Sequence, residues 1–90
     1  MKKAPILLGS IVISKAGRDE GRTFLVVAEL DDEYVLISDG NTHKMNKPKK
    51  KKRRHLKPTF VPNAEIVTRL TDGQPVFDHE VRRWLSHEEG

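Results

Sequence analysis

The sequence lacks cysteine, has few aromatic residues and contains no long apolar segment. Without cysteine the chain cannot form a disulfide or a thiolate metal site, which suits a reducing compartment. No segment approaches the roughly 20 consecutive apolar residues that a membrane-spanning helix needs. A chain of 90 residues makes one small domain with a small core. We therefore expect a cytoplasmic protein, a monomer without a membrane partner.

The first 17 residues, MKKAPILLGSIVISKAG, allow two interpretations. A basic start, an apolar middle and the small residues of Ser14-Lys15-Ala16 formally resemble a secretory signal peptide. However, Gly9-Ser10 interrupts the apolar stretch, and the residues that follow are β-branched. This composition favours a strand over the helical centre of a signal peptide, and a strand is the interpretation that we adopt.

Acidic residues are absent between Lys44 and Lys57, where nine lysines and arginines gather. The remaining sequence is acidic, with eight lysines and arginines against all 13 Asp and Glu. This asymmetry predicts one concentrated anion-binding face rather than a generally basic protein. A solubilising loop and a nuclear sorting signal are the alternatives for such a run.

Residues 9–40 show a pattern with a period of two, which predicts strands: in the second segment Phe24, Val26 and Ala28 share one face, and Leu25 and Val27 share the other. We expect these strands at 9–14, 24–30 and 34–38, with the acidic residues 31–33 as a turn. Asp39-Gly40-Asn41 favours another turn, followed by a brief fourth strand near Thr42–Met45. The lysine run that follows need not belong to the sheet and can be a mobile loop.

After the basic run, residues 55–61 predict a fifth strand that Pro58 limits to an edge or a bulge. The period then changes to that of two short amphipathic helices, at 63–72 and 78–88. Asn63 and Asp78 are the expected N-caps, and Gly73 ends the first helix. Trp84 is expected to pack the second helix onto the sheet.

The stretch SKAGRDEGR at 14–22, followed by an apolar strand, resembles the KOW motif, with Gly21 at the motif's key glycine. The resemblance covers residues 9–40 and the basic stretch, and is closest to small bacterial KOW-domain RNA-binding proteins related to archaeal and eukaryotic large-subunit ribosomal proteins. It implies a mainly-β fold, a small five-stranded SH3-like barrel. We accordingly predict a KOW-type barrel over 1–61, including the basic segment 44–57. A two-helix C-terminal appendage over 62–90 would pack on it.

The resemblance also implies that the 14–22 loop contacts RNA. Its basic side chains suit phosphate contacts, its glycines allow the RNA backbone to approach, and Asp19 would orient Arg18 or Arg22. The basic run adds contacts that do not depend on base sequence, because lysines and arginines bind the phosphates. His55 is either a further phosphate donor when protonated or a neutral residue of a strand. The candidate RNA-binding residues are Lys15, Gly17, Arg18, Gly21, Arg22, Lys44, Lys47, Lys49, Lys50, Lys51, Lys52, Arg53, Arg54, His55 and Lys57.

The sequence thus favours a small RNA-binding module of the translation apparatus, bound to ribosomal RNA or other structured RNA. Few aromatic residues are available for stacking on single strands. Ribosomal proteins are possible neighbours. The alternative is a protein-interaction module that docks through its two helices on a ribosomal or transcription-complex protein. The four histidines lack metal-site spacing and no nucleophile–base pair is evident, so we expect neither an enzyme nor a cofactor or metal.

Overall fold

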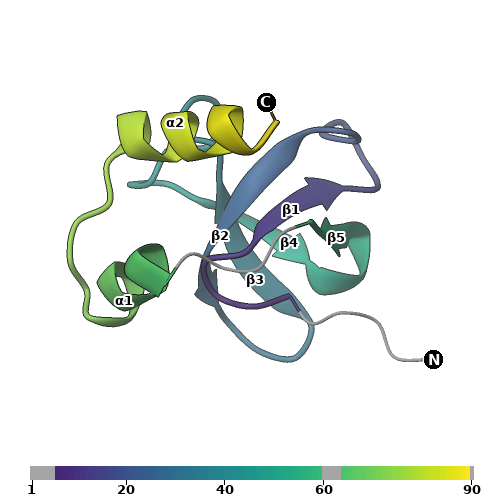
Figure 1. Cartoon of the computed structure of the whole chain (residues 1–90). Coiled ribbons are helices and arrows are strands. Elements are labelled where there is room, and N and C mark those ends of the chain that lie inside the picture. The colour runs from purple at the N-terminus through teal and green to yellow at the C-terminus, as the bar shows by residue number, and fades with distance from the viewer. Residues whose placement is uncertain (1–5, 60–63, 90) are drawn as a thin grey trace.

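A computed structural model of the chain describes residues 6–59 and 64–89, and the side chains of 6–59 and 64–86. One five-stranded antiparallel sheet is followed by two helices (Figure 1). No helix in these two ranges is long and apolar enough to cross a membrane. The elements in chain order are β1 (Ile11–Ser14), β2 (Thr23–Glu29), β3 (Tyr34–Ser38), β4 (Lys49–Lys52), the 3₁₀ helix η1 (Arg53–His55), β5 (Leu56–Pro58), α1 (Ala64–Thr71) and α2 (Asp78–Glu89).

The strands lie in the order β4-β3-β2-β1-β5, so the last strand returns to the first. Along β1, Val12 pairs with Phe24 of β2 on one side and with Pro58 of β5 on the other. The predicted edge position of Pro58 is confirmed, because β5 ends the sheet. A register shift between Val26 and Ala28 bends β2 where it pairs with β3.

Apolar side chains fill both faces of the sheet. One face carries a cluster that includes Val12, Phe24 and Leu56. The other face, with Ile11 and Leu25, is covered by residues that project from the helices. Figure 1 shows α1 and α2 beside the sheet, with α2 across the end of β2. The helix residues in this second cluster are Ile66, Val81 and Leu85, and the partly buried Leu70 and Trp84 pack against it.

The first three predicted strands are confirmed, but the expected fourth strand is wrong. Residues 42–45 form bends and the start of a turn, and β4 is built instead from four of the lysines, Lys49–Lys52. The lysine run is therefore part of the sheet and not a loop outside it. Lys51 pairs with Val35 and Lys49 with Ile37, so β3 supplies the hydrogen-bonding partner for this unusual strand.

Both predicted helices are present, with one correction to their caps. The first ends at Thr71, and Gly73 follows with a φ of 73°, as a C-terminal glycine should. Asn63 lies outside the described residues. The N-cap of α2 is Phe77 and not Asp78, because Phe77 O accepts the first helical bonds, from Glu80 N and Val81 N, while the Asp78 side chain accepts a bond from Met45 N at 2.7 Å. Glu80 instead accepts a bond from Phe77 N at 3.0 Å, which is the glutamate half of a capping box.

A second role of Glu80 is to join the two helices. Its carboxylate pairs with Arg69 of α1 at 2.8 Å. The bond from Arg69, together with that from Phe77 N, lowers the pKa of Glu80 to about 2. The pair therefore stays ionised throughout the neutral range and fixes α1 relative to α2.

Candidate nucleic-acid interface

The 14–22 loop joins β1 to β2 through two glycines with left-handed backbones. Gly17 has a φ of 80° and Gly21 a φ of 86°. Gly21 N donates to Ser14 O at 2.8 Å and continues the ladder between the strands. A Cβ on Gly21 would meet no atom within 4 Å, so backbone conformation and not crowding requires glycine there.

A buried carboxylate, that of Asp19, joins this loop to the basic run. Asp19 is only 5 % exposed. One of its oxygens accepts a hydrogen bond from Lys49 Nζ at 2.9 Å and lies 3.7 Å from His43 Nε2. The other oxygen lies 3.7 Å from Arg22. The bond from Lys49 and the neighbouring positive charges outweigh burial and lower the pKa of Asp19, which therefore remains charged.

The four lysines of β4 alternate between two sides. Lys49 and Lys51 point toward the 14–22 loop, where Lys51 is almost buried and donates to Ala16 O at 3.2 Å. Lys50 and Lys52 point the other way. Lys50 lies over the Tyr34 ring, 4.4 Å from its centroid, and Lys52 lies 3.8 Å from Glu33. The strand β4 lies at an edge of the sheet. Lysines on an edge strand hinder its pairing with the sheet of another molecule, so these charges also have a structural role.

Arg53 is occupied by contacts within the protein. Its guanidinium donates to Ile6 O at 2.7 Å, to Asp31 O at 2.9 Å and to Glu29 at 3.0 Å. These bonds tie η1 to the chain ahead of β1 and to the turn between β2 and β3. Although Arg53 is one of the predicted RNA-binding residues, an RNA phosphate would have to replace these bonds to reach it.

His55 lies in η1 and not in a strand, so that part of the prediction is wrong. Burial and the charges of Arg54, Lys51, Lys52 and Lys15 lower its pKa, so the ring is neutral at pH 7. It is thus not a positively charged phosphate donor in the free protein. The same four charges mark a region of positive potential around the ring, where Lys15 N also donates to His55 O at 2.7 Å.

The turn at 41–49, where the fourth strand was expected, surrounds a pocket of about 580 Å³. Its lining includes the exposed Lys44 and Lys47, together with Lys49 and His43. Through Lys49 and His43 the pocket adjoins Asp19, and thus the 14–22 loop. The fold therefore brings together two basic segments that are far apart in the sequence.

Most of the predicted cations fall into two groups by their surroundings, while Arg22 beside Asp19 and Lys50 over the Tyr34 ring are exposed and have a partner. Lys49, Lys51, Lys52 and Arg53 have polar partners within the protein, as described above. A second group is exposed and, within the described part of the chain, has no side-chain partner. These residues are Lys15, Arg18, Lys44, Lys47, Arg54 and Lys57.

The sequence does not predict the Asp19–Lys49 pair, although Asp19 was expected to contact an arginine. The predicted contact with Arg22 exists, whereas Arg18 is exposed and unpaired among the described residues. Lys49 follows Asp19 by 30 residues, and no local pattern links them. The only available signal was an acidic residue inside a basic loop.

No protein-family model matches this sequence, and a search of curated proteins gives no match. The interface is therefore interpreted from its own residues.

Proposed function

We propose that this chain binds structured RNA through the exposed cations of the 14–22 loop and the 41–49 turn. One observation carries the proposal. The pair between the buried Asp19 and Lys49 connects these two segments, while Arg18, Lys44 and Lys47 stay exposed and without a protein partner in the described ranges. Cations that need no internal partner are free to bind phosphates and release the counterions condensed on RNA.

The surroundings of three aromatic residues favour structured RNA over single strands. Phe24 is fully buried, Lys50 covers Tyr34, and Trp84 packs against the core between sheet and helices. None of these three offers the open ring on which the bases of a single strand stack, and the exposed Phe77 is already stacked on His79. Phosphate and 2′-OH contacts, which recognise helical RNA by shape, fit a surface of lysines and arginines.

We also propose that the sheet is a KOW-type SH3-like barrel. Two observations support this finer description. The strand β5 returns to pair with β1, and a cluster of buried apolar residues from β1, β2, β3 and β5 lies on one face of the bent sheet. With the SKAGRDEGR loop, this makes ribosomal RNA or the ribosome the expected partner.

The alternative, a protein-interaction module that uses the two helices, has less support. The apolar residues Ile66, Val81 and Leu85 that would form its docking face are already buried against the sheet. Only Phe77 among the large apolar residues of 64–86 is markedly exposed, and it stacks on His79. We therefore favour RNA.

Binding of a fluorescein-labelled RNA hairpin, measured by anisotropy, tests the proposal with a matched pair of variants. Arg18→Gln removes one exposed charge from the loop, and Arg83→Gln removes one from α2. We expect Arg18→Gln to make the slope of log K against log salt shallower by about 0.7 to 0.9 and to weaken binding to all RNAs. Arg83→Gln should change neither. Equal effects of the two variants, or no binding by the natural chain, would contradict the proposal.

Sedimentation with ribosomes tests the partner. The tagged protein should sediment with ribosomal subunits and be released after nuclease treatment. Pairing with one protein that survives nuclease would instead support the interaction module.

A further inference from the structure

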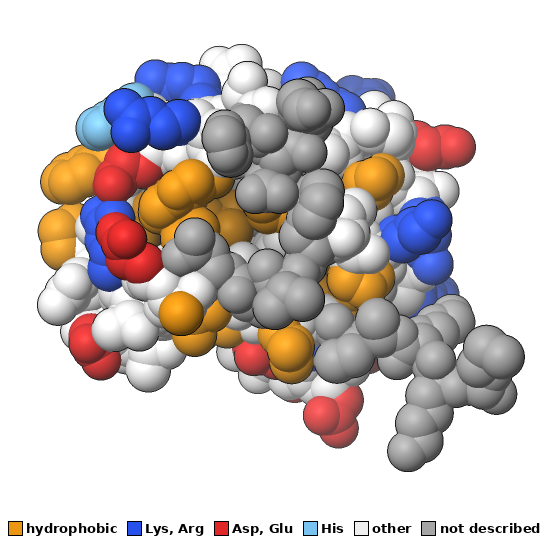
Figure 2. All heavy atoms as spheres, viewed as in Figure 1, with side chains coloured by type: hydrophobic (Ala, Val, Ile, Leu, Met, Phe, Trp, Pro, Cys, Tyr) orange, Lys and Arg blue, Asp and Glu red, His pale blue; other side chains and the backbone are white. Residues whose placement is uncertain are grey.

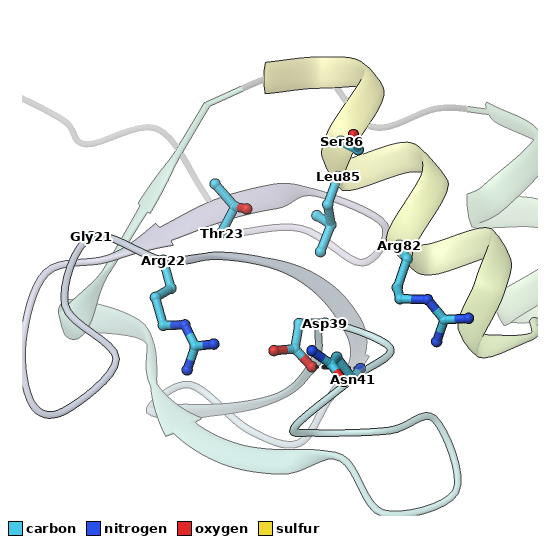
Figure 3. Close-up of a pocket in the computed structure, with 8 residues that line it drawn as sticks. All are labelled: Gly21, Arg22, Thr23, Asp39, Asn41, Arg82, Leu85 and Ser86. Carbon is cyan, nitrogen blue, oxygen red and sulfur yellow. Dashed lines mark hydrogen bonds between the residues drawn. The ribbon is translucent and has the colours of Figure 1, made fainter. Parts of the chain in front are cut away.

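A second polar pocket lies where α2 meets the 14–22 loop and the turn after β3. Its volume is about 330 Å³, and it adjoins the 41–49 pocket through the shared residue Asn41. Figure 3 shows Arg22 and Arg82 on opposite sides of it, with Asp39 and Asn41 between them and Leu85 above. Gly21, Thr23 and Ser86 complete its lining. The second C-terminal helix thus contributes side chains beside the proposed RNA interface.

The helix α2 is held firmly in this place. Met45 N donates to Asp78 at 2.7 Å, and the Arg82 guanidinium donates to Gly40 O. Gly40 has a φ of 74°, and a Cβ there would collide with the Asp78 carbonyl oxygen and lie 3.1 Å from Arg82 Cγ. The helix backbone therefore packs directly on the turn, and the pocket wall does not depend on a flexible appendage.

The chemistry of the pocket combines many hydrogen-bond donors with one charged acceptor. Two guanidinium groups and an asparagine amide donate, and Arg22 can move, since half of its side-chain surface is exposed. One oxygen of Asp39 accepts bonds from Asn41 N and His43 N, both at 2.9 Å. Its other oxygen faces Arg22 across the pocket (Figure 3). The Asp39 carboxylate would repel a phosphate that bound by itself. It can, however, accept a hydrogen bond from a hydroxyl group next to the phosphate, so the pocket fits a phosphate with a neighbouring hydroxyl.

We propose that this pocket binds one ribose–phosphate unit of the RNA backbone. Arg22 and Arg82 donate to the phosphate oxygens, and the free oxygen of Asp39 accepts a hydrogen bond from the 2′-OH. The inference rests on the proposed RNA-binding function and adds to it a role for α2 and a contact that separates RNA from DNA.

Ser86 allows the phosphate contact to be tested without breaking any bond described above. Ser86→Glu places a negative charge in the pocket, four residues from Arg82, where the two can pair. Ser86→Gln adds a similar volume without charge. We expect Ser86→Glu to bind an RNA hairpin about fivefold more weakly than Ser86→Gln. Its salt slope should be shallower by about 0.7 to 0.9. Equal affinities and slopes, with binding by the natural chain intact, would overturn this inference and leave the proposed function standing.

Asp39→Asn tests the hydroxyl contact, because asparagine keeps one oxygen for the two backbone N–H groups. The new amide nitrogen can at most donate a neutral hydrogen bond to the 2′-OH. The ratio of the affinities for an RNA and a DNA hairpin of one sequence should therefore fall about threefold, because a charge-assisted bond is replaced by a weaker one. If Asp39 only repels phosphate, the substitution will strengthen binding of both hairpins equally. That result would overturn the 2′-OH contact.

A titration with mononucleotides, followed by NMR, tests whether the pocket binds a ribose–phosphate unit even if the protein does not bind RNA hairpins. Uridine 3′-monophosphate should shift the amide signals of Thr23, Asn41 and Ser86 saturably, and 2′-deoxyuridine 3′-monophosphate should do so more weakly. Shifts without hairpin binding would contradict the proposed function but support the pocket. Absence of shifts at these amides, or equal shifts with both nucleotides, would overturn the ribose–phosphate site.

Discussion

Two regions of the molecule are basic, but the surroundings of their cations differ. They are the basic run 49–54 and the loop–turn surface formed by 14–22 and 41–49, which share Lys49. Most cations of the run are committed to the protein, through Asp19, the Ala16 carbonyl, Glu33 and the contacts of Arg53. Those of the loop–turn surface are mainly exposed. Hence the density of positive charge in a sequence does not by itself identify the residues that bind an anion.

Figure 2 shows where basic and apolar side chains lie on one face of the molecule. Basic side chains lie mainly around the edge of this face, whereas a group of apolar ones lies between the places that α1 and α2 occupy in Figure 1. Basic and apolar side chains therefore occupy different parts of this face.

The largest effect should come from the residue that links the two regions. Asp19→Asn removes a buried carboxylate and leaves Lys49 without its partner, while keeping the shape of the side chain. We expect the free energy of unfolding in urea to fall by about 2 kcal/mol. Asp32→Asn, an exposed acid in the turn after β2, is the matched control and should change stability by less than about 0.5 kcal/mol. Similar losses in both variants would show that the link has no structural importance.

Acid unfolding should reveal the same link. The folded pKa of Asp19 lies below its ordinary value of 3.8, so the unfolded chain takes up the proton first. Its contribution is fully present well above pH 3.8 and is lost as the pH falls through the folded pKa. The stability of Asp19→Asn should therefore decline less between pH 5 and the acid limit than that of the natural chain. Parallel curves would count against a charged Asp19 in the folded protein.

Smaller changes in stability should distinguish two lysines, one on each edge strand of the sheet. Lys51→Gln removes the almost buried ammonium that binds Ala16 O, and we expect it to cost about 1 kcal/mol of stability. Lys57→Gln, on the exposed side of β5, should cost less than about 0.5 kcal/mol. For RNA affinity the order should reverse, with Lys57→Gln the weaker binder. If Lys51→Gln instead loses more affinity and no stability, the division between the two groups is wrong.

The comparison also shows what the sequence could predict. The strands β1, β2 and β3 and both helices follow from periods of two and 3.6, because their apolar residues line the faces that the two clusters bury. The strand β4 has no such period, since Lys49–Lys52 are all charged. Pairing with β3 determines this strand, and the long alkyl stems of lysine allow it by leaving the ammonium groups near partners or water.

The candidate site was predictable only in its local parts. The left-handed glycines Gly17 and Gly21 bracket a polar segment where the chain must reverse sharply, which the sequence shows. The pairing of Asp19 with Lys49 and the approach of Arg82 to Gly40 join residues 30 and 42 positions apart. Both contacts depend on how β4 and α2 pack. A single sequence offers many possible residue pairs of this kind, and no local pattern distinguishes the pairs that form.

The smallest expected effect is a change at His55, which reports on the surrounding charges. In the free protein its pKa lies below the ordinary value of 6.5, since burial and four nearby cations disfavour the imidazolium. An RNA phosphate near Arg54 and Lys15 would offset these charges, so RNA should raise the pKa of His55. A titration of its ring signals by NMR, with and without an RNA hairpin at matched ionic strength, measures the shift. Potassium chloride alone screens the cations and sets the baseline. If RNA binds but shifts the pKa of His55 no more than the salt does, the phosphates lie on the 41–49 side, and Arg54 and Lys15 are not part of the interface.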